Sequence, residues 1–334
     1  MSDRAVVVGI SAYPGLRSLQ GPCHDARRFR DWLVRPDGGG LTPGAVRMLL
    51  TDDFPAPTGV DDAHPVVAEL DDLFRPLVKE AALQNHVDGR LFIFVAGHGF
   101  ADSDDIDSAA LLAANAEALF PVHLAVEKYA EFFRRTYAFR ELILVMDACR
   151  TTNPLHEIGS PPLPAVQPHP RASRVKYFRG YGASFNHVAR ERAFNGGTVQ
   201  GIFTMAFLDA LESARPNQAG RVNGTAIKRH IHNRIAAIAG DVAIAPPDIA
   251  ADEDKDVFFV HRAQSGIDVA FTFPDAYVGH ELVVEFGDRT LSGRFAIDGP
   301  ALTVPLAPGL YKVYVDGTDA SHLIEVPHDG AIAF

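Results

Sequence analysis

The sequence predicts an α/β protein that is followed by a small all-β region. Continuous apolar runs such as Ala5–Ile10 alternate with segments of helical periodicity, which is the pattern of buried parallel strands joined by helices. From about residue 265 apolar and polar residues alternate strictly, with Gly, Pro and Asp between the runs. We therefore expect a mostly parallel sheet flanked by helices, plus a C-terminal antiparallel β-sandwich.

The order of the expected elements supports this fold class. Strands are expected at 5–11, 45–50, 90–98, 141–149, 175–184 and 256–261, and helices at 23–34, 65–83, 126–135, 201–213 and 226–239. Alternation of strand and helix implies right-handed crossovers in one sheet. We expect one domain over 1–262 and a second over 265–334. The proline-rich stretch 151–175 predicts an exposed linker inside the first domain.

Composition limits the classes of function. The chain has 334 residues, 47% of them hydrophobic, and a net charge of −11, which argues against a nucleic-acid or anionic-membrane partner. The N-terminus leads directly into a strand-like run without a signal peptide, so we expect a cytoplasmic protein. Two cysteines exclude a disulfide framework, which fits a reducing compartment.

A Cys/His pair is the most informative feature of the chain. One apolar run ends at His98 and another, about 50 residues later, ends at Cys149. Open α/β sheets place their chemistry at the carboxyl ends of strands, and an imidazole is the common means of converting a thiol to its nucleophilic thiolate. The alternative for Cys149 is a buried structural thiol.

Several ordered motifs resemble the caspase-like cysteine peptidases, the superfamily of caspases, metacaspases and paracaspases. These motifs are Val6–Ser11 followed by Gly21–Ala26, then Gly97-His98-Gly99, Asp147-Ala-Cys-Arg150 and Gly201-Ile-Phe-Thr204. The resemblance is closest to bacterial, metacaspase-type members and covers about residues 4–261. It implies a caspase-like fold and a cysteine endopeptidase acting on protein or peptide substrates. It also raises the expectation of a role in regulated cell death or antiphage defence.

Two acidic residues predict the specificity of the site. Asp147 and Cys149 are two positions apart on a strand, so their side chains share a face. In metacaspases and paracaspases Asp stands at the position of Asp147, and these enzymes cleave after basic residues. Asp25 matches the second pocket acid of metacaspases, although Asp is also favoured in the first turn of any helix. Two carboxylates pair well with a guanidinium, so we expect cleavage after Arg or Lys.

Two further expectations follow from local sequence. The backbone N–H groups of Gly99 and Cys149 can form an oxyanion hole, although a glycine also serves a tight turn. Arg171 and Arg174 lie in the proline-rich linker, where extended chain would present them for self-cleavage; an inert surface loop is the alternative.

We expect no metal and no cofactor. Some metacaspases require calcium, and the chain has aspartates at 102, 104, 105 and 107, but this run lacks the Gly and Glu of an EF-hand loop. The C-terminal domain lies outside the resemblance and is a candidate site for a regulator or partner. The competing interpretation is a catalytically weak or inactive caspase-like scaffold that binds a partner.

Overall fold

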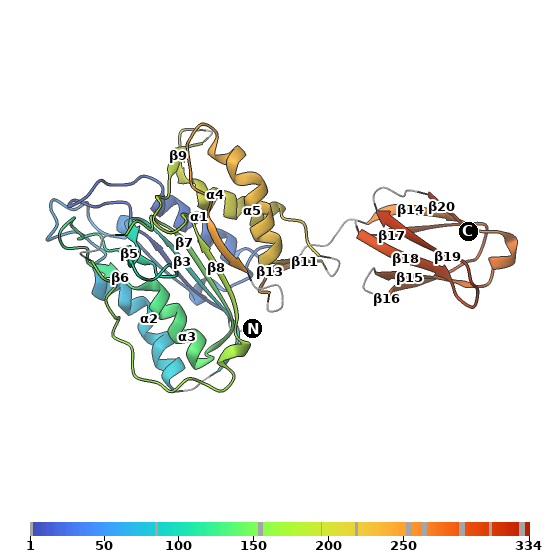
Figure 1. The fold of residues 1–334 in the computed structure, drawn as a ribbon, viewed down its shortest axis with the longest axis horizontal. Helices are drawn as coiled ribbons and strands as arrows, with labels where there is room; N and C mark the ends of the chain where they lie inside the picture. The colour runs from blue at the N-terminus through green and yellow to red at the C-terminus, as the bar shows by residue number, and fades with distance from the viewer. Residues whose placement is uncertain are drawn as a thin grey trace. The chain divides into compact units, whose positions relative to one another are not determined.

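The chain forms two compact units (Figure 1). The structure is a computed structural model and describes residues 3–83, 86–152, 156–194, 196–217, 220–251, 256–261, 266–286, 291–306, 309–326 and 331–334. The first unit comprises Met1–Arg215 and Val222–Val260, and the second comprises Pro216–Arg221 and His261–Phe334. Among the described residues, no helix is both long enough and apolar enough to cross a bilayer.

A six-stranded sheet forms the centre of the first unit, with strand order β12-β8-β7-β3-β1-β2. Its strands are β1 (Arg4–Gly9), β2 (Val46–Leu50), β3 (Val87–Ala96), β7 (Phe139–Asp147), β8 (Lys176–Tyr181) and β12 (Asp248–Ala251). All are parallel to their neighbours except β12, which runs antiparallel to β8 at the edge. The predicted mostly parallel sheet is confirmed.

Helices cover both faces of this sheet (Figure 1). One face carries α1 (Pro22–Val34), α4 (Ile202–Ser213) and α5 (Gly224–Ala239), and the other carries α2 (Val67–Ala82) and α3 (Val126–Thr136). Successive strand residues enter different cores, so Val7 packs under α1 while Val8 packs under α2. Each such burial contributes about 1.5–3 kcal/mol, and cover on both faces explains why these strands are apolar throughout.

Shorter elements surround the main sheet. They are the three-stranded sheet of β4 (Gly99–Phe100), β5 (Ala110–Leu112) and β6 (His123–Leu124), the pair β9 (Glu191–Ala193) and β10 (Val199–Gly201), the pair β11 (Arg221–Asn223) and β13 (Phe258–His261), and the 3₁₀ turns η1 (Pro43–Ala45), η2 (Thr51–Asp53) and η3 (Ala172–Arg174). The strand expected at 256–261 thus forms as β13, but it lies outside the main sheet.

The second unit is a β-sandwich. One sheet contains β14 (Ile267–Thr272), β17 (Ala301–Leu306) and β20 (Ala331–Ala333), and the other contains β15 (Glu281–Phe286), β16 (Leu291–Ala296), β18 (Gly309–Val315) and β19 (Ser321–Val326), with η4 at Asp275–Tyr277. Inward-facing residues of both sheets, such as Phe271 and Val284, share one core. The strands are antiparallel as expected, except that β20 pairs in parallel with β14.

A close contact between β1 and α1 brings the start of α1 to the carboxyl end of the sheet. A Cβ on Gly9 would lie only 2.6 Å from the Pro22 carbonyl oxygen, so glycine permits this approach. Pro22 occupies the first turn, where its missing N–H costs no helical hydrogen bond. Asp25 follows in the same turn and therefore lies at the end of the sheet where Cys149 is expected.

The proline-rich linker is held more firmly than its composition predicts. The side chain of Ile158 is buried, the Lys128 ammonium donates a 2.6 Å hydrogen bond to its carbonyl oxygen, and Leu163 and Val166 pack against the α2–α3 core. Residues 153–155 lie outside the described residues. The expectation of a fully exposed linker is therefore wrong over this part, because its few apolar side chains find a core to enter.

Candidate active site

The register of the central sheet brings the ends of β3 and β7 together. Ala96 pairs with Asp147, and the Gly97 N–H donates to the Asp147 carbonyl oxygen at 3.2 Å. The next residues along both strands leave the sheet at the same edge. His98 and Cys149 consequently line one cavity of about 280 Å³ at the carboxyl ends of the strands, which is where open α/β sheets place ligands.

Hydrogen bonds fix the tautomer of His98. Its Nε2 lies 2.7 Å from the carbonyl oxygen of Arg17. A carbonyl oxygen only accepts, so Nε2 carries the proton and Nδ1 of the neutral ring keeps a free lone pair. The imidazole is thereby oriented as a base by a backbone group. No sequence pattern marks this partner, because any residue at position 17 supplies a carbonyl.

Tyr13 is a positioning residue that sequence reasoning missed. Its hydroxyl accepts a 3.0 Å hydrogen bond from the His98 backbone N–H and donates to the Leu112 carbonyl oxygen at 3.2 Å. Its ring packs edge-on against the imidazole, with centroids 4.7 Å apart. Burial raises the pKa of Tyr13, so the phenol stays neutral. Gly97 has φ +156°, and a Cβ there would lie 2.5 Å from the Tyr13 hydroxyl, so glycine is required beside the tyrosine.

The Cys149 thiol is at rest in its protonated form. Its Sγ lies 3.9 Å from the carbonyl oxygen of Ala189. Burial raises the pKa of this thiol, while the nearby Arg190 guanidinium acts in the opposite direction. Burial therefore disfavours the thiolate form of Cys149. The base form of His98 offers a route to remove the proton when an electrophile is bound.

Two buried aspartates form the floor of the cavity. Asp147 Oδ2 accepts hydrogen bonds from the Thr204 N–H at 2.9 Å and from its hydroxyl at 2.7 Å, and Asp25 Oδ2 accepts one from the Gly201 N–H at 2.8 Å. Asp25 Oδ1 is buried and has no partner among the described residues. Gly201 lies between the two carboxylates, because a Cβ there would lie 2.1 Å from Asp147 Oδ2.

Ionisation of the two aspartates in the floor is electrostatically unfavourable. Burial, together with the charge of Asp147, raises the pKa of Asp25 to about 8. Burial likewise raises the pKa of Asp147 to about 6, although the hydrogen bonds from Thr204 oppose the shift. Two acids that are hard to ionise, one of them with an unpaired oxygen, indicate a site that a cationic group would complete.

A third carboxylate, Glu191, lies beside the floor and was not predicted. It lines the same cavity and accepts hydrogen bonds from the backbone N–H groups of Gln20 and Gly21, at 3.1 and 2.9 Å. Its charge adds to the rise in pKa of both aspartates. Glu191 begins the short strand β9, where no motif marks it, so only the folded chain brings it to the site.

Comparison with known proteins agrees with this geometry. Residues 2–236 match the model of the caspase domain. The chain belongs to the caspase-domain family. It is 27% identical over 229 residues to a probable protease from a Desulfuromonadales bacterium, an alignment that covers 63% of this chain and 26% of that relative. The chain thus matches about a quarter of the length of that curated relative.

Among solved structures, this caspase-domain protein is similar to caspase-1 from Spodoptera frugiperda. The sequence identity is 11%, the TM-score is 0.48, and the match covers 75% of this chain and 88% of the other. The family match ends at residue 236, before the sandwich strands that begin with β14. The resemblance inferred from the His98 and Cys149 motifs is confirmed at the level of the family.

Gly99 lies next to the cavity but is not among the described residues that line it. The Leu112 N–H donates to the His98 carbonyl oxygen at 2.8 Å, so Gly99 and Leu111 form a non-hydrogen-bonded pair and the Gly99 N–H points away from β5. A Cβ on Gly99 would lie 2.9 Å from the Cβ of Ala148. Gly99 is thus packed against Ala148, the residue that precedes Cys149, with its N–H outside the β4–β5 ladder.

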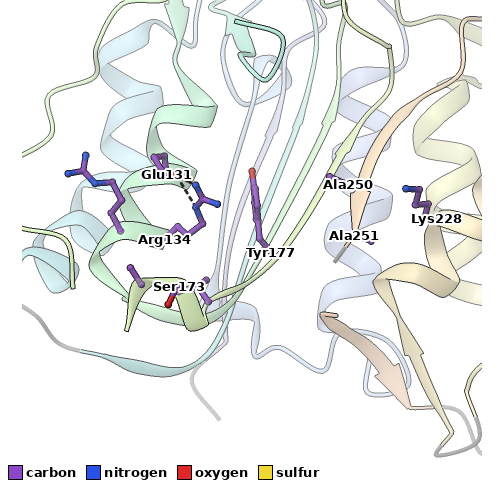
Figure 2. Close-up of a pocket in the computed structure, with 10 residues that line it drawn as sticks. Glu131, Arg134, Ser173, Tyr177, Lys228, Ala250 and Ala251 are labelled. Carbon is purple, nitrogen blue, oxygen red and sulfur yellow. Dashed lines mark hydrogen bonds and ion pairs between the residues drawn. The ribbon is translucent and has the colours of Figure 1, made fainter. Parts of the chain in front are cut away.

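Arg171 and Arg174 flank a second, larger cavity that lies away from the Cys/His pair. This cavity, of about 640 Å³, is lined by residues that include Arg134, Ser173 and Tyr177 (Figure 2). Tyr177 lies at the amino end of β8, opposite the strand ends that carry Cys149. Both arginines are exposed, and Ala172–Arg174 forms the turn η3. An extended conformation of this segment would require η3 to open.

The aspartate loop makes contacts that stabilise the fold. Asp102 Oδ1 accepts a 2.6 Å hydrogen bond from the Ile158 N–H, and Asp107 pairs with Arg179 at 2.7 Å. Within the described part of the chain, no three His, Cys, Asp or Glu side chains are grouped to hold a metal ion. These two carboxylates therefore already have partners in the folded protein.

Proposed function

We propose that this chain is a cysteine endopeptidase that cleaves after Arg or Lys. The observation that carries the proposal is the composition of one cavity, in which a base-oriented His98 and the Cys149 thiol lie above the carboxylates of Asp25, Asp147 and Glu191. A thiol and imidazole supply nucleophilic catalysis, and a buried acidic floor favours a cationic P1 side chain.

The residues support a complete acyl-transfer sequence. His98 Nδ1 takes the proton of Cys149 as Sγ attacks the scissile carbonyl carbon, and the backbone N–H groups of Gly99 and Cys149 stabilise the oxyanion. The protonated imidazole then gives its proton to the leaving amine, which leaves a thioester. Water, deprotonated by the same imidazole, hydrolyses the thioester and restores the thiol.

Specificity in this proposal comes from charge neutralisation in the floor. A guanidinium that enters the cavity gives Asp25 Oδ1 the partner it lacks and lowers the pKa of both aspartates. An aspartate side chain would instead place a fourth carboxylate beside three others. Because an unpaired buried charge costs several kcal/mol, we expect Arg to be preferred over Asp by at least about a hundredfold.

The decisive experiment measures hydrolysis of internally quenched peptides that differ only at P1. Wild-type protein is expected to cleave after Arg and Lys but not after Asp, and Cys149→Ala is expected to cleave none of them. Efficient cleavage after Asp would overturn the specificity. Failure to cleave any peptide, together with no labelling of Cys149 by an electrophile with Arg at P1, would favour the inactive scaffold.

We also propose that self-cleavage after Arg171 or Arg174 accompanies activity. Both side chains are exposed in the segment that separates β7 from β8, so cleavage would divide the catalytic unit into two parts joined by the sheet. Intact-mass measurement of active protein beside Cys149→Ala tests this. A single full-length species in both samples, during turnover of peptide, would contradict it.

The catalytic sequence proposed above uses no metal ion, and the contacts of Asp102 and Asp107 leave these carboxylates occupied. We therefore expect peptide hydrolysis to survive a chelator; loss of activity in EDTA that calcium restores would contradict this. A cytoplasmic location, a regulator that binds the second unit, and a role in regulated cell death or antiphage defence remain proposals that rest on the sequence and the resemblance.

A further inference from the structure

The cavity that holds Cys149 carries opposite charges at its floor and at its mouth. Asp25 and Asp147 are buried at the floor, whereas Arg17 and Arg190 line the same cavity and are exposed. Neither guanidinium has a hydrogen-bond or ion-pair partner among the described residues. In a chain with net charge −11, two unpaired cations around an acidic pocket are available for groups of a bound substrate.

Arg190 lines the cavity next to a residue that contacts the Cys149 thiol. It lies between Ala189, whose carbonyl oxygen is 3.9 Å from Cys149 Sγ, and Glu191, whose carboxylate lies beside the floor. Its own carbonyl oxygen accepts the Ile202 N–H at 2.9 Å, which fixes the backbone. Because successive side chains of extended chain point to opposite sides, Arg190 faces the mouth when Glu191 faces the floor.

The electrostatics of the thiol agree with this placement. Arg190 lines the same cavity as Cys149, and its charge favours the thiolate against the larger effect of burial on the pKa. An acidic residue next to P1 in a bound peptide would therefore come close to Arg190.

Arg17 lines the cavity together with His98. Its carbonyl oxygen is 2.7 Å from Nε2 of His98, the residue that protonates the leaving amine in the proposed mechanism. The residue that follows the scissile bond is attached to that amine. Its side chain is therefore directed to the part of the cavity that His98 and Arg17 line.

Building on the proposed peptidase function, we propose that Arg190 and Arg17 select substrates in which the basic P1 residue has acidic neighbours, with Arg190 reading P2 and Arg17 reading P1′. A P1 side chain that descends to the floor directs its neighbours in extended chain toward the mouth. Acidic neighbours pair with the two guanidinium groups there, and basic neighbours are repelled. Exposed ion pairs are weak, so each position is expected to change kcat/KM by about 3- to 10-fold.

The test uses internally quenched peptides with Arg fixed at P1 and with Glu or Lys at P2 and at P1′. For the wild type, the Glu-to-Lys ratio of kcat/KM should be about 3 to 10 at each position and should fall toward one at high salt. Arg190→Glu should invert the ratio at P2 and leave that at P1′. Arg17→Glu should invert the ratio at P1′ and leave that at P2.

Matched variants separate this inference from loss of folding and from the proposed function. Arg47→Glu changes an exposed arginine on β2, outside the cavity, and should leave both ratios unchanged. If Arg190→Glu does not fold, Arg190→Gln should reduce the P2 ratio to about one. Glu-to-Lys ratios of one in the wild type, or ratios that the arginine variants do not change, would overturn the inference. Cleavage after Arg in the same peptides would still support the proposed peptidase function. No cleavage after Arg in any peptide would instead overturn the proposed function.

Discussion

The wall and the floor of the cavity are built in opposite ways. The wall consists of His98 and Cys149, and the Arg17 carbonyl and the Tyr13 hydroxyl hold the histidine in place through its Nε2 and its backbone N–H. The floor gathers Asp25, Asp147 and Glu191 from three distant segments, and one oxygen of Asp25 has no partner. In the proposed mechanism the reacting groups are thus held in place before substrate binds, whereas the substrate-binding floor would be completed by a cationic side chain.

Removal of the nucleophile is the largest change we expect. Cys149→Ala should lower kcat for a P1 Arg peptide by about 10⁴-fold or more, and His98→Ala by orders of magnitude, because the two residues act as one unit. Steady-state kinetics measure both losses. Thermal melting of Cys149→Ala should resemble that of the wild type. Turnover by this variant near the wild-type rate would show that Cys149 does not carry the reaction.

A change in the floor should lower specificity more than reactivity. Asp147→Asn is expected to reduce kcat/KM for P1 Arg by about a hundredfold, since the guanidinium loses a charge-assisted partner. Labelling of Cys149 by iodoacetamide, which carries no P1 group, should change little. An equal loss in both assays would mean that Asp147 supports the nucleophile and not the substrate.

The pH dependence of specificity separates the role of the floor from that of Cys149 and His98. The pKa of Asp147 is about 6 and that of Asp25 about 8, so the floor gains charge as pH rises through this range. The measurement compares kcat/KM for a peptide with Arg at P1 to kcat/KM for a peptide with neutral citrulline at P1. The titration of Cys149 and His98 affects both peptides equally and cancels in the ratio. This ratio should rise between about pH 5 and 9. Asp25→Asn should remove the upper part of the rise. A ratio independent of pH would contradict the floor as the cation site.

Loss of the tyrosine hydroxyl should affect the wall alone. Tyr13→Phe leaves the His98 N–H without its acceptor and loosens the imidazole, so kcat should fall by about tenfold. The KM for P1 Arg should stay near its wild-type value, because Tyr13 does not touch the floor. A change confined to KM would assign Tyr13 to substrate binding.

The smallest effect concerns stability. The pKa of Asp25 is higher in the folded chain than in the unfolded chain, so the folded state loses stability as pH rises from about 4 to 8. Asp25→Asn removes this loss and should raise the free energy of unfolding at pH 8 by about 2 kcal/mol, with no gain at pH 4. Thermal melting at both pH values measures it, with exposed Asp31→Asn on the same helix as the control. Lower stability of Asp25→Asn than of the wild type at pH 8 would contradict the conclusion that the buried carboxylate of Asp25 lacks a partner.

Local patterns were enough to predict the helices and most of the main sheet. The strands β3 and β7 are long apolar runs, and they end two residues before His98 and Cys149, so Asp147 is the last residue of β7. The edge strand β12 was missed because it has only four residues, follows two prolines and lacks a recognisable alternation. The strands β4, β5 and β6 are two or three residues long, which is too short to show the alternation of apolar and polar residues that predicts a strand.

The amino-acid sequence was enough to predict the fold class and to nominate Cys149, His98, Asp25 and Asp147 as site residues, because each lies near the end of a predicted element or in a short motif. The contacts of His98 with the Arg17 carbonyl and Tyr13, the position of Glu191 beside the floor and that of Gly201 between the aspartates emerge only in the folded chain. These groups meet across long separations in sequence. A backbone carbonyl, a buried hydroxyl or the room left by a missing Cβ acquires a role only when the chain has folded around it.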